Sequence, residues 1–274
     1  MIFSMPELPE VETIKRDLSR LIIGQGIEDV FVRDDRVIKS HKLNDFISSL
    51  KSKTVQGVDR RGKLIVISFK EGGYLLAHLK MTGQLIYGER LNLKETKVVF
   101  KLSRGQYLNY NDHRLFGRLS FVRQLQDEPF LNAIGPEPLK NGFNTEWLSR
   151  NLKRRSVSIK TLLLDQHFVA GIGNIYASEI LFDAGINPLK PASRLTKKEV
   201  ASLYQSTLDI LREAIQYRGC SMRNYRDASG EEGKFLNRVR VYNREHQPCR
   251  VCGTMIQRMV QNGRSTYFCQ RCQQ

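Results

Sequence analysis

The sequence lacks long hydrophobic runs, a secretory leader and internal repeats. None of its apolar stretches approaches the roughly 18 residues that span a bilayer, which excludes a helical membrane protein. The first ten residues, MIFSMPELPE, contain neither a basic region nor an apolar core, so we expect a protein that is not secreted. A chain of 274 residues with 41% hydrophobic and 26% charged residues is instead typical of a globular protein of about two domains.

Acidic residues are scarce relative to basic ones. The chain has 28 Asp and Glu against 44 Lys and Arg, a net charge of +16, and its isoelectric point is near 9.8. Such an excess of positive charge attracts polyanions, nucleic acid above all. Charge alone leaves open a soluble protein that merely has a basic surface.

Hydrophobic periodicity predicts a β-rich first half. Apolar residues at helical spacing predict one helix from Val11 to Ile22, which Gly24 and Gly26 end. Short apolar runs separated by glycines or charged turns then predict an antiparallel sandwich or barrel. The expected strands are 30–32, 64–69, 74–78, 84–87, 97–102, 106–109 and 118–122.

The second half is predicted to be helical. The Gly- and Pro-rich stretch 134–142 indicates a boundary, and 219–234 has no periodicity and indicates a mobile loop. A short strand is expected at 239–242. The predicted helices are 145–152, 159–164, 174–184 and 197–217. The predicted domains are 5–134, 135–234 and 235–274.

Four of the five cysteines form two closely spaced pairs, Cys249 with Cys252 and Cys269 with Cys272. Two such pairs match the spacing of a Cys₄ zinc site, which is closed and therefore structural. Two disulfides would need an oxidising compartment, and a redox pair fits a short basic tail less well. We expect one structural zinc, a β-hairpin, and a buried or inert Cys220.

Two glycines precede a predicted helix in the segment 165–176. Gly171 and Gly173 allow close backbone approach, and Asn174 is a favourable N-cap. No strand precedes them, so a dinucleotide-binding fold is not indicated. The unpaired N–H groups of a helix start can bind an anion such as a DNA phosphate. The alternative is that the glycines only let two helices pack closely.

The chain start combines a proline with a carboxylate. If Met5 is removed, Pro6 becomes a secondary amine that can form an iminium with an aldehyde-like carbon, and Glu7 could move protons there. The alternative is an ordinary helix start, where prolines and acidic residues are common. Composition alone favours that alternative.

Three distant motifs together resemble the formamidopyrimidine-DNA glycosylase family. They are MPELPEVET at 5–13, VAGIGNIYASEILF at 169–182, and the Cys₄ tail, so that the resemblance runs from Met5 to the end of the chain. It implies a bacterial, cytoplasmic, nucleoid-associated repair enzyme, monomeric and acting on double-stranded DNA. Such an enzyme excises 8-oxoguanine and formamidopyrimidines and cleaves the abasic strand by β,δ-elimination. The implied fold is α+β and multidomain: an N-terminal helix plus β-sandwich, a helix–two-turn–helix domain and a zinc finger.

The resemblance also assigns roles to single residues. Pro6 would attack C1′ of the damaged nucleoside to form a Schiff base, and Glu7 would donate protons for base loss and ring opening. Lys63, on a hairpin turn, would donate a proton for β-elimination. Arg264 would act in δ-elimination and clamp phosphates. Lys160 and Asn174 would contact phosphates, and Arg155 would be a further basic DNA-binding position.

A trio of side chains is implied to fill the gap left by an extruded nucleotide: Met81, Arg114 and Phe116. A thioether and an aromatic ring can replace lost stacking, and a guanidinium can hydrogen-bond the orphaned base. Without the resemblance, core packing would be expected for Met81 and Phe116.

The sequence departs from the family pattern at several positions. His113 stands where a proline is common, Leu115 replaces a basic residue, and Glu95 replaces a DNA-contacting histidine. The segment MIFS precedes the motif, and an amide nitrogen cannot be the nucleophile, so we expect the active chain to begin at Pro6. The alternatives are an endonuclease VIII-like enzyme for oxidised pyrimidines, or a non-catalytic damage-binding protein if Pro6 is not N-terminal.

Overall fold

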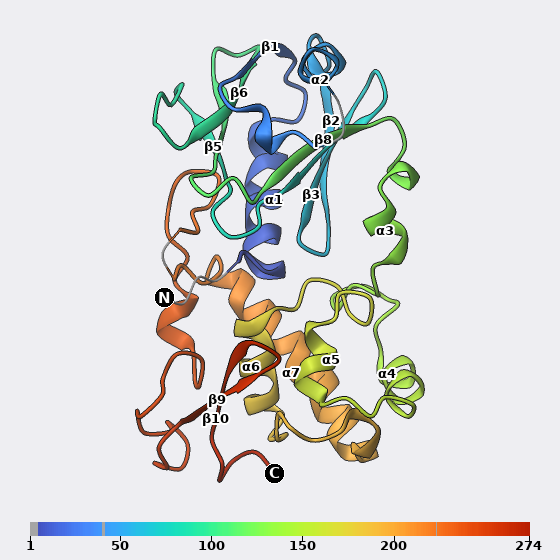
Figure 1. Cartoon of the computed structure of the whole chain (residues 1–274), viewed down its shortest axis with the longest axis vertical. Coiled ribbons are helices and arrows are strands. Elements are labelled where there is room, and N and C mark those ends of the chain that lie inside the picture. Colours follow the sequence, from blue (N-terminus) through green and yellow to red (C-terminus); the bar gives the residue numbers. More distant parts are fainter. Residues whose placement is uncertain (1–4, 40–41, 223) are drawn as a thin grey trace. The chain divides into compact units, whose positions relative to one another are not determined.

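The computed structural model describes residues 5–39, 42–222 and 224–274, so the MIFS segment lies outside the described residues (Figure 1). The chain folds into two compact units, each built from two stretches of sequence. The N-terminal unit contains the chain up to Ala133 together with Tyr217–Leu236. The C-terminal unit contains Ile134–Gln216 and Asn237–Gln274.

The N-terminal unit contains two four-stranded antiparallel sheets, which confirms the predicted sandwich. The strand orders are β1-β6-β7-β5 and β2-β3-β4-β8. The strands are β1 (Ile27–Val32), β2 (Val55–Arg61), β3 (Leu64–Phe69), β4 (Tyr74–His78), β5 (Gln84–Gly88), β6 (Thr96–Leu102), β7 (Tyr107–Asn111) and β8 (Arg118–Val122). The helices of this unit are α1 (Leu8–Leu21), α2 (Leu43–Leu50) and α3 (Pro129–Ala133).

Helix α1 contributes to the same core as both sheets. Its residues Val11, Ile14 and Leu18 recur at helical spacing and are fully buried beside strand residues of the two sheets. Burying each such side chain stabilises the unit by about 1.5–3 kcal/mol. The residues at the N-terminus of α1 are thereby fixed relative to the strands.

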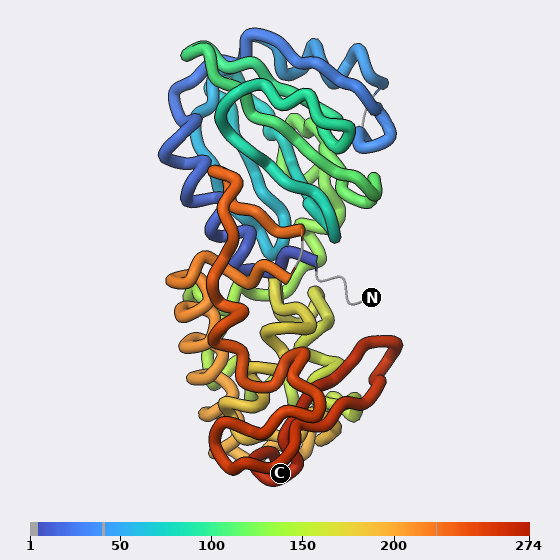
Figure 2. Tube along the Cα trace, turned by 90° about the vertical axis from the view of Figure 1, so that its left-hand side faces the viewer, coloured from blue at the N-terminus to red at the C-terminus, as the bar shows by residue number. Residues whose placement is uncertain are grey.

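A stretch that we call the return segment, Tyr217–Leu236, follows the last long helix and belongs to the N-terminal unit. Figure 2 shows it in orange, running alongside the strands. The Tyr87 N–H of β5 donates to the Ala228 carbonyl at 2.8 Å, and the Gln84 side chain donates to the Asn224 carbonyl at 2.5 Å. Its course is irregular, as predicted, but it is closely packed, since Tyr225 and Ala228 are buried in the core.

The C-terminal unit contains four of the predicted helices and a hairpin. These elements are α4 (Thr145–Leu152), α5 (Ile159–Leu164), α6 (Asn174–Asp183), α7 (Lys197–Gln216), β9 (Gln257–Gln261) and β10 (Arg264–Phe268). Short 3₁₀ turns complete the fold: η1 (Asp35–Val37), η2 (Leu125–Asp127), η3 (Ala192–Arg194) and η4 (Phe235–Arg238). In the part of the chain that the structure describes, no helix has the length and apolarity to cross a membrane.

The strand predicted at 239–242 is wrong. The backbone N–H groups of Arg240, Val241 and Tyr242 donate instead to the carboxylate of Glu179 in α6, at 2.7, 3.0 and 2.8 Å. A backbone that turns all three donors toward one carboxylate cannot also pair with a strand. Complete burial raises the pKa of Glu179, although these three bonds lower it.

Candidate functional site

The predicted nucleophile and proton donor lie at the N-terminus of α1. Pro6 is buried, and Glu7 is the N-cap residue, with 3% of its surface exposed. The Glu7 N–H donates to Glu10 Oε2 at 2.8 Å, and the two residues form a capping box. These residues therefore form a helix start, and the carboxyl group of Glu7 directly follows Pro6 in the chain.

Lys63 lies in a two-residue turn between β2 and β3. Arg61 pairs with Leu64, and Gly62 has a φ of +59°, the pattern of a hairpin turn with glycine at its first central position. Lys63 is 5% exposed. The turn predicted for this lysine is therefore present.

Arg60, which the sequence did not single out, ties this turn to α1. Its guanidinium is buried and donates to Glu12 Oε2 at 3.1 Å and to the Gly62 carbonyl at 2.9 Å. Burial raises the pKa of Glu12, but hydrogen bonds from Arg16 and Arg60 outweigh it and lower that pKa overall. The Lys63 turn and the helix that carries Glu7 are thus held by one charged contact.

His78 lies opposite Leu64 on β4, beside the turn of Lys63. Its Nδ1 accepts the Lys80 N–H at 3.1 Å. Burial, followed by the positive charges of Lys80, Arg118 and Lys63, holds the pKa of His78 well below its ordinary value. The imidazole is therefore neutral at physiological pH.

The predicted gap-filling residues Met81, Arg114 and Phe116 lie together. The Arg114 guanidinium is 3.8 Å from Met81 Sδ and 4.5 Å from the Phe116 ring centroid. Phe116 is 51% exposed, which excludes core packing for this ring. A thioether, a guanidinium and an aromatic ring thus share one region of the surface.

Asp112 fixes the loop that carries two of these residues. It is fully buried and accepts the N–H of Gly117 at 2.8 Å, the N–H of Arg114 at 3.2 Å and the hydroxyl of Thr82. Nothing in the local sequence distinguishes it from a surface aspartate.

The structure also describes the three positions at which the sequence departs from the family pattern. The backbone carbonyl of Glu95 accepts the Asp112 N–H, His113 is exposed, and Leu115 has a φ of +57°.

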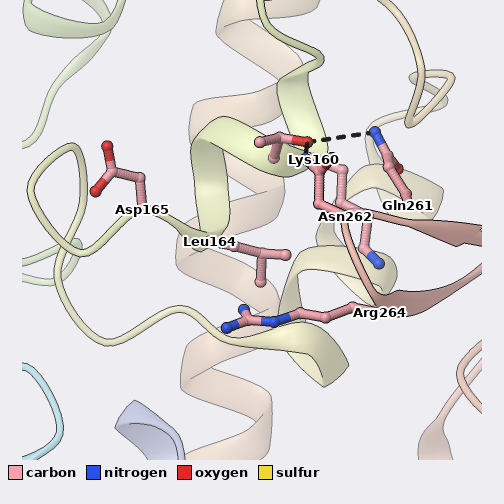
Figure 3. A pocket seen from close by; sticks show the side chains of 7 residues that line it. Lys160, Leu164, Asp165, Gln261, Asn262 and Arg264 are labelled. Atoms are coloured by element: carbon pink, nitrogen blue, oxygen red, sulfur yellow. Dashed lines mark hydrogen bonds between the residues drawn. The ribbon is translucent and has the colours of Figure 1, made fainter.

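A basic pocket of about 240 Å³ lies in the C-terminal unit between α5 and the β9–β10 hairpin (Figure 3). Lys160 is 1% exposed, and its ammonium donates to Asn174 Oδ1 at 2.7 Å, Thr266 Oγ1 at 2.7 Å and the Ser265 carbonyl at 3.1 Å. The pocket is lined by Lys160, Thr161, Leu164, Asp165, Gln261, Asn262 and Arg264. Lys160, Asn174 and Arg264, far apart in the sequence, are thus brought together.

Helix α6 begins at Asn174, but its N-cap is Gly173 and not Asn174 as predicted. The Asn174 side chain is engaged elsewhere, because its Nδ2 donates to the Ser265 carbonyl at 2.9 Å while its Oδ1 accepts Lys160. Gly171 has a φ of +85°, which favours glycine, and donates its N–H to the Gln166 side chain.

Arg155 is not among the residues that line this pocket. It is exposed after the end of α4, where it lines a separate basic hollow with Arg150, Asn151, Lys153 and Arg154. Among the described residues, no acidic side chain pairs with Lys153, Arg154 or Arg155. These cations are available to an external anion.

The four clustered cysteines fit a zinc ion. The sulfurs of Cys249, Cys252, Cys269 and Cys272 lie within 4.8 Å of one another. The Cys249–Cys272 and Cys252–Cys269 sulfur distances are 3.9 and 3.4 Å, close to the ~3.8 Å that tetrahedral Zn–S bonds require. Hydrogen bonds from Thr254 lower the pKa of Cys252 to about 6, whereas burial raises the pKa values of Cys269 and Cys272, so the fit to zinc rests on the sulfur geometry.

Comparison with known proteins shows similarity along nearly the whole chain. The profile of the formamidopyrimidine-DNA glycosylase N-terminal domain matches residues 5–119. The profile of the H2TH domain of the same glycosylase matches 134–226, and that of a zinc finger found in FPG and IleRS matches 247–274. The formamidopyrimidine-DNA glycosylase of Desulfitobacterium hafniense (strain DSM 10664 / DCB-2) is 43% identical, covering 98% of this chain and 100% of the relative.

Solved structures show the same similarity. The MutM (Fpg) protein of Thermus thermophilus has a TM-score of 0.89 at 39% identity, with 98% of each chain covered. A Lactococcus lactis Fpg mutant in complex with Fapy-dG-containing DNA has a TM-score of 0.92 at 34% identity, covering 98% of this chain and 100% of that one. The Lactococcus lactis Fpg in complex with DNA containing an abasic site has a TM-score of 0.91 at 34% identity, with 98% and 99% covered.

Proposed function

The chain belongs to the formamidopyrimidine-DNA glycosylase family, and from this premise we propose which of its residues perform each step of the reaction. It is a base-excision-repair DNA glycosylase and abasic-site lyase that acts on damaged double-stranded DNA. Its four clustered cysteines hold one zinc ion, which organises the C-terminal tail. We propose 8-oxoguanine and formamidopyrimidines as its substrates.

Pro6 and Glu7 carry the first stage of this proposal. The Pro6 amine attacks C1′, the bond from C1′ to the damaged base breaks, and the base leaves with a proton that Glu7 supplies. Glu7 then takes the amine proton and passes it to O4′ as the C1′–O4′ bond breaks, which leaves an iminium between Pro6 and C1′. The position of both residues at the start of α1, with Glu7 buried directly beside Pro6, is the observation that carries the proposal.

Lys63 and Arg264 carry the strand-cleavage stage. The iminium withdraws electrons, so C2′ loses a proton and the 3′ phosphate departs; a second elimination then expels the 5′ phosphate. Lys63 serves the first elimination as proton donor, and Arg60 supports its turn by linking it to Glu12 of α1. Arg264 stabilises the phosphate that departs in the second.

DNA binding is assigned to residues of both units. Lys160, Asn174 and Arg264 line or border the basic pocket, which suits a phosphate, and Arg155 offers a further cation. Met81, Arg114 and Phe116 occupy the space of the extruded nucleotide, a role that fits the exposure of Phe116 and its stacking with Arg114. As functional divisions we propose 5–134, 135–234 and 235–274, working as a monomer in the bacterial cytoplasm beside the nucleoid.

Borohydride trapping tests the assignment of the nucleophile. Reduction converts an iminium into a stable amine, so a chain that begins at Pro6 should become covalently linked to an 8-oxoguanine duplex. A chain that keeps MIFS should not, because its Pro6 nitrogen is an amide. Peptide mass analysis of the trapped product identifies the linked residue. Efficient trapping by the extended chain, or a link at Lys63, would refute the role of Pro6.

The choice of substrate has its own test. Single-turnover cleavage is compared on otherwise identical duplexes that carry 8-oxoguanine or thymine glycol. We expect faster excision of 8-oxoguanine. Preference for thymine glycol would support an endonuclease VIII-like activity, and binding without cleavage of either duplex would support a damage-binding protein.

A further inference from the structure

Glu10 joins two parts of the N-terminal unit that are 210 residues apart in the sequence. Its Oε2 accepts the N–H of Glu7 at 2.8 Å, and its Oε1 accepts the N–H of Cys220 at 2.7 Å. Because Glu10 is only 2% exposed, water does not compete for either bond. One carboxylate therefore holds both the chain start and the beginning of the return segment.

The backbone of the return segment is shaped to this carboxylate. Gly219 has a φ of +82°, and a Cβ at this position would lie 2.7 Å from Glu10 Oε1 and 2.9 Å from its Cγ. The Gly219 carbonyl in turn accepts the Phe235 N–H at 2.9 Å, which closes the two ends of the segment on each other. Glycine is required at this position both for its conformation and for the closeness of Glu10.

A second anchor holds the same segment without touching the chain start. The Arg218 guanidinium donates to Asp17 Oδ2 at 2.6 Å and to Asp227 Oδ2 at 2.5 Å. Asp17 lies two helical turns after Glu10 on α1, so it contacts the segment and not Glu7. The molecule thus contains its own control for the effect of Glu10.

We propose that Glu10 is a positioning residue that couples the return segment to Pro6 and Glu7. The inference rests on the proposed function of these two residues. Since the N–H groups of Glu7 and Cys220 share one carboxylate, a displacement of the return segment reorients the peptide that carries the nucleophile and the proton donor. A movement of the segment is then transmitted to the groups that act at C1′, whereas Asp17 holds the segment alone.

The test compares Glu10→Gln with Asp17→Asn in a chain that begins at Pro6. Glutamine keeps one carbonyl oxygen, so one of the two N–H bonds is lost, and asparagine weakens only the Arg218 anchor. Hydrogen exchange of residues 217–222 reports on the segment. Borohydride trapping on a duplex with a preformed abasic site, which has no damaged base to be recognised, reports on Pro6.

We expect the backbone amides of residues 217–222 to exchange hydrogen faster in both variants than in the parent chain. Only Glu10→Gln should also lower the trapping rate, by about tenfold, the kinetic equivalent of one lost hydrogen bond to a charged group. Gly219→Ala, which crowds Glu10 from the other side, should behave like Glu10→Gln and serves in its place if that variant does not fold.

Two results would overturn the coupling. If hydrogen exchange of residues 217–222 is unchanged in Glu10→Gln, Glu10 caps helix α1 and does not hold the return segment. If Glu10→Gln and Asp17→Asn are trapped at equal rates, Glu10 anchors the return segment without acting on the chain start. Failure of the parent chain to trap at all would instead contradict the proposed function, while the exchange measurement would still test the contact.

Discussion

Three buried charged side chains near the proposed sites, Lys160, Arg60 and Asp112, each have more than one hydrogen-bond partner. The Lys160 ammonium has three oxygen acceptors, the Arg60 guanidinium has a carboxylate and a carbonyl, and Asp112 accepts from backbone and hydroxyl donors. Leaving one such group without its partner costs about 1–3 kcal/mol, so these networks fix the geometry of the groups they surround. These buried networks therefore hold each charged group in one position.

His78 provides a pH test at the same scale. Its folded-state pKa is lowered by burial and nearby cations, so protons bind the unfolded chain first. The contribution of neutral His78 to the free energy of unfolding is fully present above about pH 6.5. Below that pH it should fall by about 1.4 kcal/mol per pH unit, until the folded-state pKa is reached. In His78→Asn, the side-chain oxygen can still accept the Lys80 N–H but does not titrate.

Urea unfolding at pH 7.5 and pH 5 measures this difference. Between these values the parent chain should lose more of its free energy of unfolding than His78→Asn does, because only His78 binds a proton on unfolding. Parallel losses in the two proteins would show that His78 does not titrate in this interval or that its folded-state pKa is ordinary.

Local chemistry decides which elements can be predicted from the sequence. Helices α4 and α5 occupy their predicted ranges because polar caps, Asn144 and Ser158, stand directly before apolar residues at helical spacing. The sequence VQGVDRR has few apolar residues and does not predict strand β2, whose conformation is determined by its pairing with β3. The predicted strand at 239–242 fails for the same reason, since a distant carboxylate determines its backbone.

The same reasoning applies to the proposed sites. Pro6 and Lys63 could be proposed from the family resemblance that short motifs carry, and the zinc-binding cysteines could be predicted from their spacing. Glu10 could not, because the N–H that gives it a second role lies 210 residues away. A residue that positions others is identified from its contacts, and these contacts form only in the folded chain.

The Cys₄ tail leads to a prediction at the scale of elements. Strand β10 supplies two of the three acceptors of Lys160, and Gln273 donates to the Ile186 carbonyl, so the tail and the helices of the C-terminal unit support each other. Chelation of zinc should therefore abolish DNA binding and also destabilise α5 and α6, because structural zinc supplies folding free energy.

The single tryptophan, Trp147, reports on the C-terminal unit, since it packs against Phe143 and Phe168. We expect chelation, or Cys249→Ser, to lower the unfolding midpoint of its fluorescence. Cys220→Ser, which removes a thiol outside the cluster, is the matched control and should leave zinc content and DNA binding intact. A zinc-free preparation with full affinity for DNA would contradict this prediction.

At the scale of the whole molecule, the net charge of +16 predicts binding that depends strongly on salt. Each neutralised phosphate contributes a slope of about 0.9 to the fall of log affinity with log salt concentration. Arg264→Ala should lower this slope by the amount of about one phosphate contact. It should weaken binding to damaged and undamaged duplexes equally, because phosphate contacts carry no sequence information.

The control for this measurement is Arg36→Ala, which removes the same charge from an exposed residue paired with Asp34. Fluorescence anisotropy at several salt concentrations gives the slope for each protein. An Arg264→Ala slope equal to that of Arg36→Ala would exclude a phosphate contact by Arg264.

The return segment also sets the order in which the protein can mature on the ribosome. Because translation runs from the N-terminus, Glu10 and Asp17 emerge long before Cys220 and Arg218, the residues that complete their contacts. At about 5–20 residues per second, Tyr217 is synthesised about 5–20 seconds after Val122, the last residue of the sheets of the N-terminal unit. A nascent chain truncated before Tyr217 therefore carries the chain start without the segment that fastens it, and repair competence arrives only as synthesis nears its end.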